Sequence, residues 1–328
     1  MVSKSVNRLV WIDWMKAIGI YLVILGHFYS VCEKFIYVFH IPLFFVISGI
    51  LTKKESQVLV FWKKLWYNLI VPMLIMAVVN FVYSCIGQFS DGTFEWATFY
   101  WFVRNVLFGM VAGFDTLWFV YTLVLLKIVF QYSFSDKVFY LFSLALLAFA
   151  YFYNNSDLST LPFFLKEPNS YVDVFTAIPF FALGIFVRDY KRMLNEWNNV
   201  LTIIASSVCG FIIVLLCWRY NGDVGLYCCN YGGNMFLFLL GGLSGTMMIF
   251  AFSKLFRQVP PFVSIISRGT IIVLGLHKLL IYLVRDFFSA SYLDILFAVL
   301  IVMLFIPVII WTEKYFPLMA GKYRINKL

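Results

Sequence analysis

The stretch "RLVWIDWMKAIGIYLVILGHFYS", residues 8–30, has the length and hydropathy of a membrane-spanning helix, yet it carries titratable side chains. Three of them, Asp13, Lys16 and His27, lie well inside the apolar run. A charged group at the centre of a bilayer costs about 2.5–3.5 kcal/mol on insertion scales, so such groups are kept where they face a cavity or a partner. The stretch therefore predicts a membrane helix that turns a polar face toward the inside of a protein.

These polar side chains form one stripe along the predicted helix. Lys16 and His27 are eleven residues apart, which places them within about 20° of the same face and about 16.5 Å apart along the axis. Asp13 precedes Lys16 by one helical turn and can pair with it, and Arg8 extends the stripe at its start. A stripe of this kind is typical of a pathway or site. The alternative is a buried polar network that only fixes helix packing.

The composition extends this interpretation to the whole chain. Of 328 residues, 63% are hydrophobic and only 12% charged, whereas soluble domains are about 45–50% apolar and about 25% charged. Inside a bilayer the backbone polar groups must be satisfied within the segment, so the spans must be helices. The sequence predicts an all-α, polytopic integral membrane protein. We expect a single membrane domain over residues 1–328, with no appended soluble domain.

Ten apolar segments have about the length that crosses a hydrocarbon core of about 30 Å. They are residues 9–31, 35–52, 65–88, 117–134, 138–153, 172–187, 199–217, 233–252, 264–284 and 293–311. Segment 97–113 is aromatic and carries Arg104, which favours an interfacial or re-entrant helix. An even number of spans places both termini on one side of the membrane.

The positive charges orient this topology. Seventeen of the 25 Lys and Arg residues lie on the side of the termini, while Lys16, Lys127 and Lys278 fall inside spans. Because cytoplasmic loops carry an excess of Lys and Arg, both termini are expected in the cytoplasm of a multi-pass cell-membrane protein. This distribution also explains the net charge of +9 without a nucleic-acid partner.

The second apolar segment contains "FHIPLFFVISG", residues 39–49. Pro42 cannot donate a backbone bond to the carbonyl of Val38, which loosens the helix there. Ser48 and Gly49 allow another helix to approach closely. A short loop joins the first two segments, so His27 and His40 are expected at similar depth, where two imidazoles can act as a base and its orienting partner. The alternative for His40 is a hydrogen-bonded core residue.

Motifs of other function classes are missing. The sequence has no P-loop, no dinucleotide-binding glycine pattern, no nucleophile elbow and no HExxH, so transport driven by ATP within this chain is not expected. The six cysteines include no spaced CxxC pair, and no metal is expected. The third histidine, His277, also falls in an apolar segment.

Together these residues resemble the membrane-bound acyltransferase-3 family, and within it the fucose 4-O-acetylase-like and capsular O-acetyltransferase branch. The family pattern of Arg or Lys, ten residues, then His is matched by Lys16 and His27, with Lys where Arg is commoner. "LWFV" (117–120), "FFALG" (180–184) and "GTIIVLGLH" (269–277) resemble later family stretches.

The resemblance implies transfer of an acyl group, usually acetyl from acetyl-CoA, to a sugar hydroxyl of an envelope polysaccharide or lipid-linked glycan. The family's essential histidine corresponds to His27 and its basic partner to Lys16, while Asp13 and the second-segment His40 complete the catalytic set. The chemistry agrees, because a sugar hydroxyl is a poor nucleophile until a base such as neutral His removes its proton.

Binding of the donor is expected to need cations near the cytoplasm. Lys16 is too far along the helix to touch the same atom as His27, so Lys16 and Arg8 are expected to steer the CoA end while the pantetheine arm reaches His27. The basic loop 53–64, with Lys63, and Arg188 are further candidates. A competing interpretation is an exporter of a polysaccharide or lipid-linked sugar, although the chain lacks the paired broken helices of many transporters. The sequence leaves the oligomeric state open.

Overall fold

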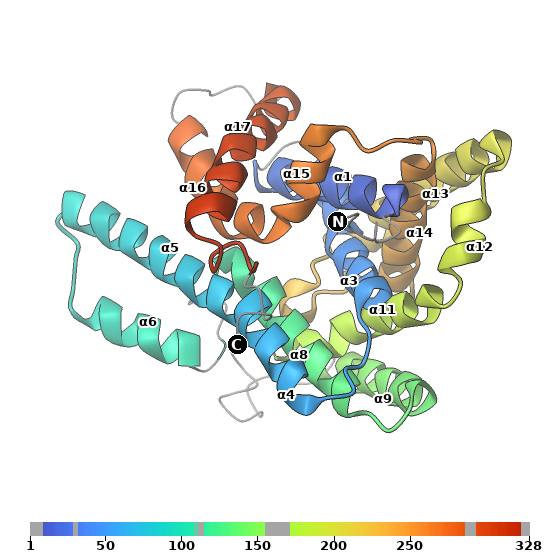
Figure 1. Ribbon diagram of the computed structural model, residues 1–328, viewed down its shortest axis with the longest axis horizontal. Coiled ribbons are helices and arrows are strands. Elements are labelled where there is room, and N and C mark those ends of the chain that lie inside the picture. Colours follow the sequence, from blue (N-terminus) through green and yellow to red (C-terminus); the bar gives the residue numbers. More distant parts are fainter. Residues whose placement is uncertain are drawn as a thin grey trace, which may run out of the picture.

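The computed structural model describes residues 9–28, 32–107, 109, 115–154, 171–285 and 293–322. Within them the protein is a bundle of helices (Figure 1). The helices are α1 (Val10–His27), α2 (Glu33–Tyr37), α3 (His40–Leu51), α4 (Val58–Leu65), the π-helical η1 (Trp66–Ile70), α5 (Val71–Ser90), α6 (Ala97–Leu107), the 3-10 turn η2 (Asp115–Leu117), α8 (Trp118–Tyr132), α9 (Asp136–Asn154), α11 (Asp173–Arg188), α12 (Lys191–Glu196), α13 (Val200–Asn221), the 3-10 turn η4 (Tyr227–Cys229), α14 (Met235–Lys254), α15 (Pro261–Arg268), α16 (Thr270–Arg285) and α17 (Asp294–Tyr315). The prediction of an all-α, polytopic membrane protein is confirmed.

Each of the ten predicted spans corresponds to a helix or a helix pair. By length and composition, seven helical segments of the described residues can cross a membrane, or eight when the bent pair α15–α16 is taken as one span. The other two, α8 and α11, have 15 and 16 residues. The count of ten spans therefore stays a prediction. Segment 97–113 contains the 11-residue α6, whose position at a membrane interface also stays a prediction.

Helix α1 lies at the centre of the bundle. It packs against α2, α3, α14, α15, α16 and α17, and its apolar residues Ile20 and Ile24 are fully buried. Such a position suits a helix that carries polar groups, because those groups face protein and cavities instead of lipid. By contrast, only 22% of the membrane-crossing window of α13 is buried, as expected for a lipid-facing helix.

The second predicted span is broken where Pro42 indicated. Helix α2 ends at Tyr37, Val38 and Phe39 form a turn, and α3 begins at His40. The carbonyl of Val38 cannot receive a bond from Pro42, which has no N–H. His40 is therefore the first residue of α3, within the stretch Glu33–Leu51 that can cross a membrane as one segment.

The predicted close approach at Gly49 is also present. A Cβ built on Gly49 would lie 2.2 Å from the carbonyl oxygen of Phe181, and one on Gly184 would lie 2.2 Å from that of Val46. Helices α3 and α11 thus cross backbone to backbone. This crossing holds α3, and with it His40, against the bundle.

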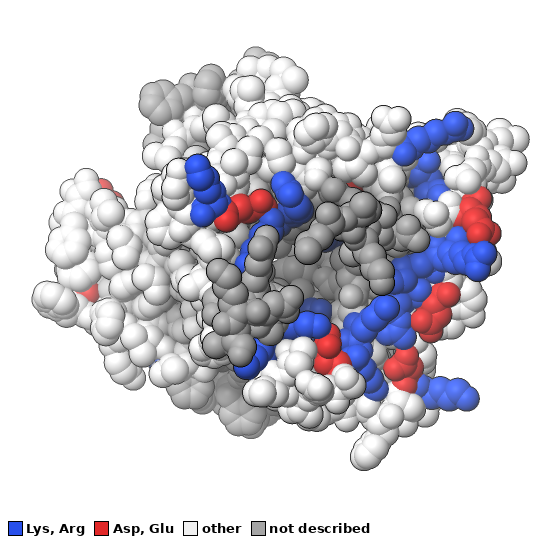
Figure 2. Space-filling model, viewed as in Figure 1, with Lys and Arg blue, Asp and Glu red and all other residues white. Residues whose placement is uncertain are grey.

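The charged residues support the predicted orientation. Figure 2 shows Lys and Arg side chains gathered on one face, toward α4, α11 and α12. Lys16 near the start of α1 and Lys322 at the end of the described chain line the same cavity. The two ends of the described chain thus lie at one end of the bundle, although their location in the cytoplasm stays a prediction.

Candidate functional site

Two of the three histidines line one cavity of about 280 Å³, here called the histidine cavity. Its residues come from α1, α2, α3, the 116–118 segment, the 222–234 loop and α16: His27, Tyr37, His40, Ile41, Thr116, Trp118, Gly225, Leu226, Tyr227 and Lys278. The third, His277, is fully buried behind it, with its ring centroid 4.9 Å from that of His27. The structure therefore brings His27 and His40 together, as predicted, and adds His277.

Backbone carbonyls orient two of these imidazoles. Nδ1 of His40 lies 2.9 Å from the carbonyl oxygen of Ile36, and Nδ1 of His277 lies 2.8 Å from that of Val273. A carbonyl oxygen only accepts, so each Nδ1 must carry the proton and donate it. In their neutral forms both rings therefore have a proton-free Nε2.

The imidazole of His27 is held by ring contacts and not by a backbone carbonyl. It is the last residue of α1, and its ring packs beside Tyr37 and His277, with centroid distances of 6.3 Å and 4.9 Å. Among the described residues, no hydrogen bond ties either of its nitrogens to the protein. His27 is thus a cavity imidazole that can accept a proton from a bound molecule.

The 222–234 loop forms a rigid wall of the histidine cavity. Gly225 and Asn230 exchange two backbone hydrogen bonds of 2.9 and 3.0 Å. Next to them the hydroxyls of Thr176 and Tyr231 are 2.6 Å apart, and burial raises the pKa of Tyr231, so this phenol keeps its proton. The wall presents Tyr227, whose ring centroid is 5.8 Å from that of Trp118.

A second cavity, the basic cavity, lies at the other end of α1. It has a volume of about 310 Å³ and is lined by four cations, Lys16, Lys127, Arg268 and Lys322, with no acidic side chain among its described lining residues. A neighbouring cavity of about 280 Å³, here called the loop cavity, shares Leu51, Asn68, Leu69 and Lys127 with it. Positive charge is therefore concentrated at the end of the bundle opposite His27.

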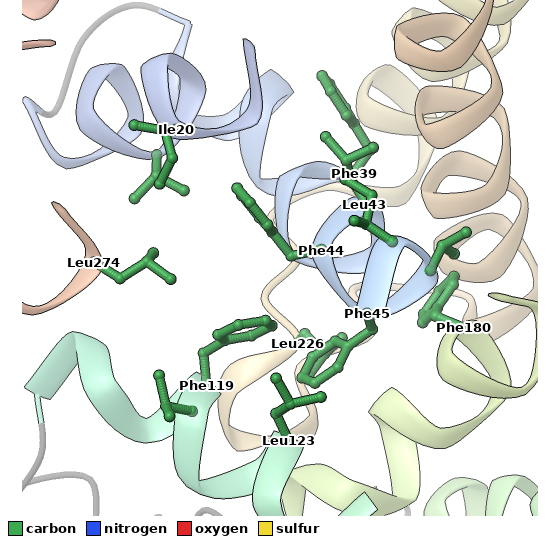
Figure 3. Close-up of a cluster of buried hydrophobic side chains, with 14 of the residues drawn as sticks. Ile20, Phe39, Leu43, Phe44, Phe45, Phe119, Leu123, Phe180, Leu226 and Leu274 are labelled. Carbon is green, nitrogen blue, oxygen red and sulfur yellow. The ribbon is translucent and has the colours of Figure 1, made fainter. Parts of the chain in front are cut away.

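Helices α1, α3, α8 and α16 contribute residues both to the histidine cavity and to the basic cavity. These elements also carry four buried apolar side chains, Ile20 from α1, Phe44 from α3, Phe119 from α8 and Leu274 from α16, of which the last three form the apolar wall of the basic cavity. These four, here called the apolar barrier, project toward one another in Figure 3. The rings of Phe44 and Phe119 make an edge contact with centroids 6.0 Å apart. The arrangement places packed apolar side chains between the cations and the histidines.

Asp13 does not reach the histidine cavity. It is buried near the start of α1 and accepts a hydrogen bond of 2.5 Å from the Ser267 hydroxyl of α15. Asp13 and His27 are fourteen positions apart, which corresponds to about 21 Å along the helix. Its place therefore indicates a role in positioning α1, and the predicted catalytic role has no support from this geometry.

The predicted donor-binding residues are divided. Lys16 lines the basic cavity, whereas Lys63 lines none of the three cavities among the described residues, and Arg8 lies outside the described residues. Arg188 is held in a structural network: it donates to Asp136 at 3.0 Å, to Asp189 at 3.1 Å and to the carbonyl of Thr52 at 3.2 Å. Arg188 thus joins the end of α3 to the start of α9.

Replacing this arginine tests its assignment. We expect Arg188→Met to lower the free energy of unfolding by about 1–2 kcal/mol, because Asp136 and the Thr52 carbonyl lose a charged donor at a partly exposed site. The Michaelis constant for acetyl-CoA, the donor expected from the sequence, should stay unchanged. Thermal unfolding in detergent and donor kinetics measure the two effects, and a raised Michaelis constant with unchanged stability would restore the donor-binding role.

Several cavity residues were not assigned to the site from the sequence: Tyr37, Thr116, Trp118, Lys127, Tyr227, His277 and Lys278. Lys127 and Lys278 carried the same signal as Lys16, a charge inside an apolar span. The stretches 117–120 and 269–277 supply Trp118 and His277. Tyr227 had no signal, because one aromatic residue in a loop is common in a membrane protein.

Comparison with known proteins identifies the family of the chain. A family model described as an acyltransferase domain matches residues 9–313. Searches of curated proteins and of solved structures gave no match. The matched region includes all three histidines and the described lining of the histidine cavity, and it includes the lining of the basic cavity apart from Ala320, Gly321 and Lys322. Because it covers nearly the whole chain, the protein belongs to the acyltransferase-3 family of membrane acyltransferases.

Proposed function

We propose that this membrane acyltransferase moves an acetyl group from acetyl-CoA to a sugar hydroxyl of an envelope polysaccharide or lipid-linked glycan, in the manner of the fucose 4-O-acetylase-like and capsular O-acetyltransferase branch. The observation that carries the proposal is the imidazole of His27, which faces a cavity and has no hydrogen-bond partner among the described residues. Such a group is available to act on a bound hydroxyl.

In the proposed reaction, His27 removes the proton from the acceptor hydroxyl as its oxygen attacks the thioester carbonyl. The tetrahedral intermediate collapses, the carbon–sulfur bond breaks, and the proton passes from His27 to the leaving CoA thiolate. His40 and His277 are each oriented by a backbone carbonyl. In this proposal they hold the ring of His27 in position. Neither residue is required to accept the substrate proton.

The separation of the two cavities favours a long donor with a charged end. Lys16 and His27 are eleven residues apart on α1, or about 16.5 Å, so a compact molecule cannot touch both. The extended acetyl-CoA can touch both, because a narrow pantetheine arm separates its phosphates from the thioester. The phosphates would occupy the basic cavity, and the arm would pass the apolar barrier.

The histidine cavity supplies the features that a carbohydrate acceptor needs. Trp118 and Tyr227 offer aromatic faces, and a few polar groups converge beside them, as in other small-molecule sites. The 222–234 loop lies at the end of the bundle opposite the cation-rich face, which suits an acceptor that reaches the site from outside the cell membrane. The acceptor class rests on this chemistry together with the family.

The direct test is balanced product formation. Purified protein in detergent or vesicles, given acetyl-CoA and a glycan fraction, should release free CoA in equal amount to alkali-labile acetate on the glycan. CoA release without ester formation would indicate a thioesterase. Changed glycan movement with neither product would favour the exporter.

A further inference from the structure

Lys127 is a cation of the basic cavity that takes no part in the proposed proton transfer. It lies in the apolar helix α8, and its partly buried side chain lines both the basic cavity and the loop cavity. Its ammonium donates one hydrogen bond of 2.6 Å to the Thr52 hydroxyl, and that hydroxyl donates to the carbonyl of Ser48. Among the described residues Lys127 makes no ion pair. Two of its three N–H groups are therefore available to a molecule in the cavities.

The carboxylates around these cavities are engaged by other cations. Asp136 is bound by Arg188 at 3.0 Å and by Lys54 at 3.8 Å. Glu55, the acidic residue of the loop cavity, is bound by Lys64 at 2.6 Å. A positive charge inside a membrane domain is costly unless an anion or cavity compensates it. Lys127 therefore relies on the two cavities that it lines, and an anion that enters them meets a cation without a carboxylate partner among the described residues.

A third carboxylate holds the far wall of the basic cavity. Glu313 pairs with Lys322 and lies 3.8 Å from Arg268. Those two cations are thus partly neutralised, whereas Lys127 is not. Among the described residues, the uncompensated charge is centred where the two cavities meet, at Lys127.

We propose that Lys127 is the centre of a phosphate-binding site for the nucleotide end of the acyl donor. The inference rests on the proposed function and names a residue that the pattern of Lys16 and His27 does not include. Lys acts as a strong point charge toward phosphate. The two cavities that meet at Lys127 give room for phosphate groups on either side, while the apolar barrier directs the uncharged arm toward His27.

The test compares a donor that has phosphates with one that lacks them. Lys127→Met is expected to lower kcat/KM for acetyl-CoA by about 10- to 100-fold, the loss of one charge-assisted contact or two. It should leave kcat/KM for S-acetylpantetheine unchanged, because that donor has no phosphate. Lys137→Met is the matched control, since Lys137 is an exposed lysine of α9, and it should change neither value. An equal loss with both donors would overturn the proposal and leave Lys127 as a packing residue.

A binding measurement separates this site from the acyl-transfer reaction. Inorganic diphosphate and adenosine 3′,5′-bisphosphate should raise the unfolding temperature of the wild type and not that of Lys127→Met. This result without any acyl transfer would support the site and overturn the proposed function. Stabilisation of both proteins alike would overturn the site. Lys127→Gln, which keeps a donor to Thr52 without the charge, replaces Lys127→Met if that variant does not fold.

Discussion

His27→Ala is expected to lower acyl transfer at least about 100-fold, because a positioned general base typically contributes about 10²–10⁴-fold. The change removes the imidazole that faces the histidine cavity, where the proposed acceptor would bind. No internal hydrogen bond of the described residues is lost with it, so the variant should reach the membrane at normal levels. Alkali-labile acetate on envelope glycans, measured at equal amounts of membrane protein, checks the prediction.

The control for this experiment is His40→Gln. Nδ1 of His40 donates to the carbonyl of Ile36, so this variant should lose stability and a smaller part of the activity. Equal acetate with wild type and His27→Ala would remove His27 from the chemistry. If His40→Gln abolished transfer while His27→Ala kept it, the base would be His40. Changed glycan export, with no acetate even in wild type, would point to the exporter.

Gly49→Val is expected to prevent folding or to destabilise the protein strongly. Its Cβ would meet the carbonyl oxygen of Phe181 at 2.2 Å and the Cα of Gly184 at 2.9 Å. Overpacking usually costs about 1–3 kcal/mol when side chains can rotate away, but these obstacles are backbone atoms of a packed helix. We expect the free energy of unfolding to fall by more than that range. The measurement is the yield of monodisperse protein in detergent, which should be lost.

Gly87→Val is the matched control for this substitution. Gly87 also lies within a helix, α5, and a Cβ there meets nothing within 4 Å. Both variants carry the same helix-propensity cost of a β-branched residue, so the difference between them measures the helix contact alone. A Gly49→Val protein as stable as Gly87→Val would show that α3 and α11 do not cross at this distance.

Much of the candidate site followed from individual residues of the sequence. Lys16 and His27 are related by helix geometry alone, because eleven residues are close to three turns. Pro42 marked the break before α3, and Gly49 marked a close helix crossing, since each acts on its own backbone. Arg188 and Lys63 illustrate the limit: their charges indicated a basic face, but not which anions or cavities each one contacts.

The amino-acid sequence by itself determined the helical membrane class, the polar stripe of α1 and the concentration of cations at one end. These properties depend on local spacing and on the cost of charge in a bilayer, which act on each segment separately. Only the tertiary structure decided that His277 packs beside His27, that Asp13 bonds to Ser267, and that Arg188 is neutralised while Lys127 is not. Those outcomes depend on which helices pack together, and the neighbours of a side chain on another helix have no fixed spacing in the sequence.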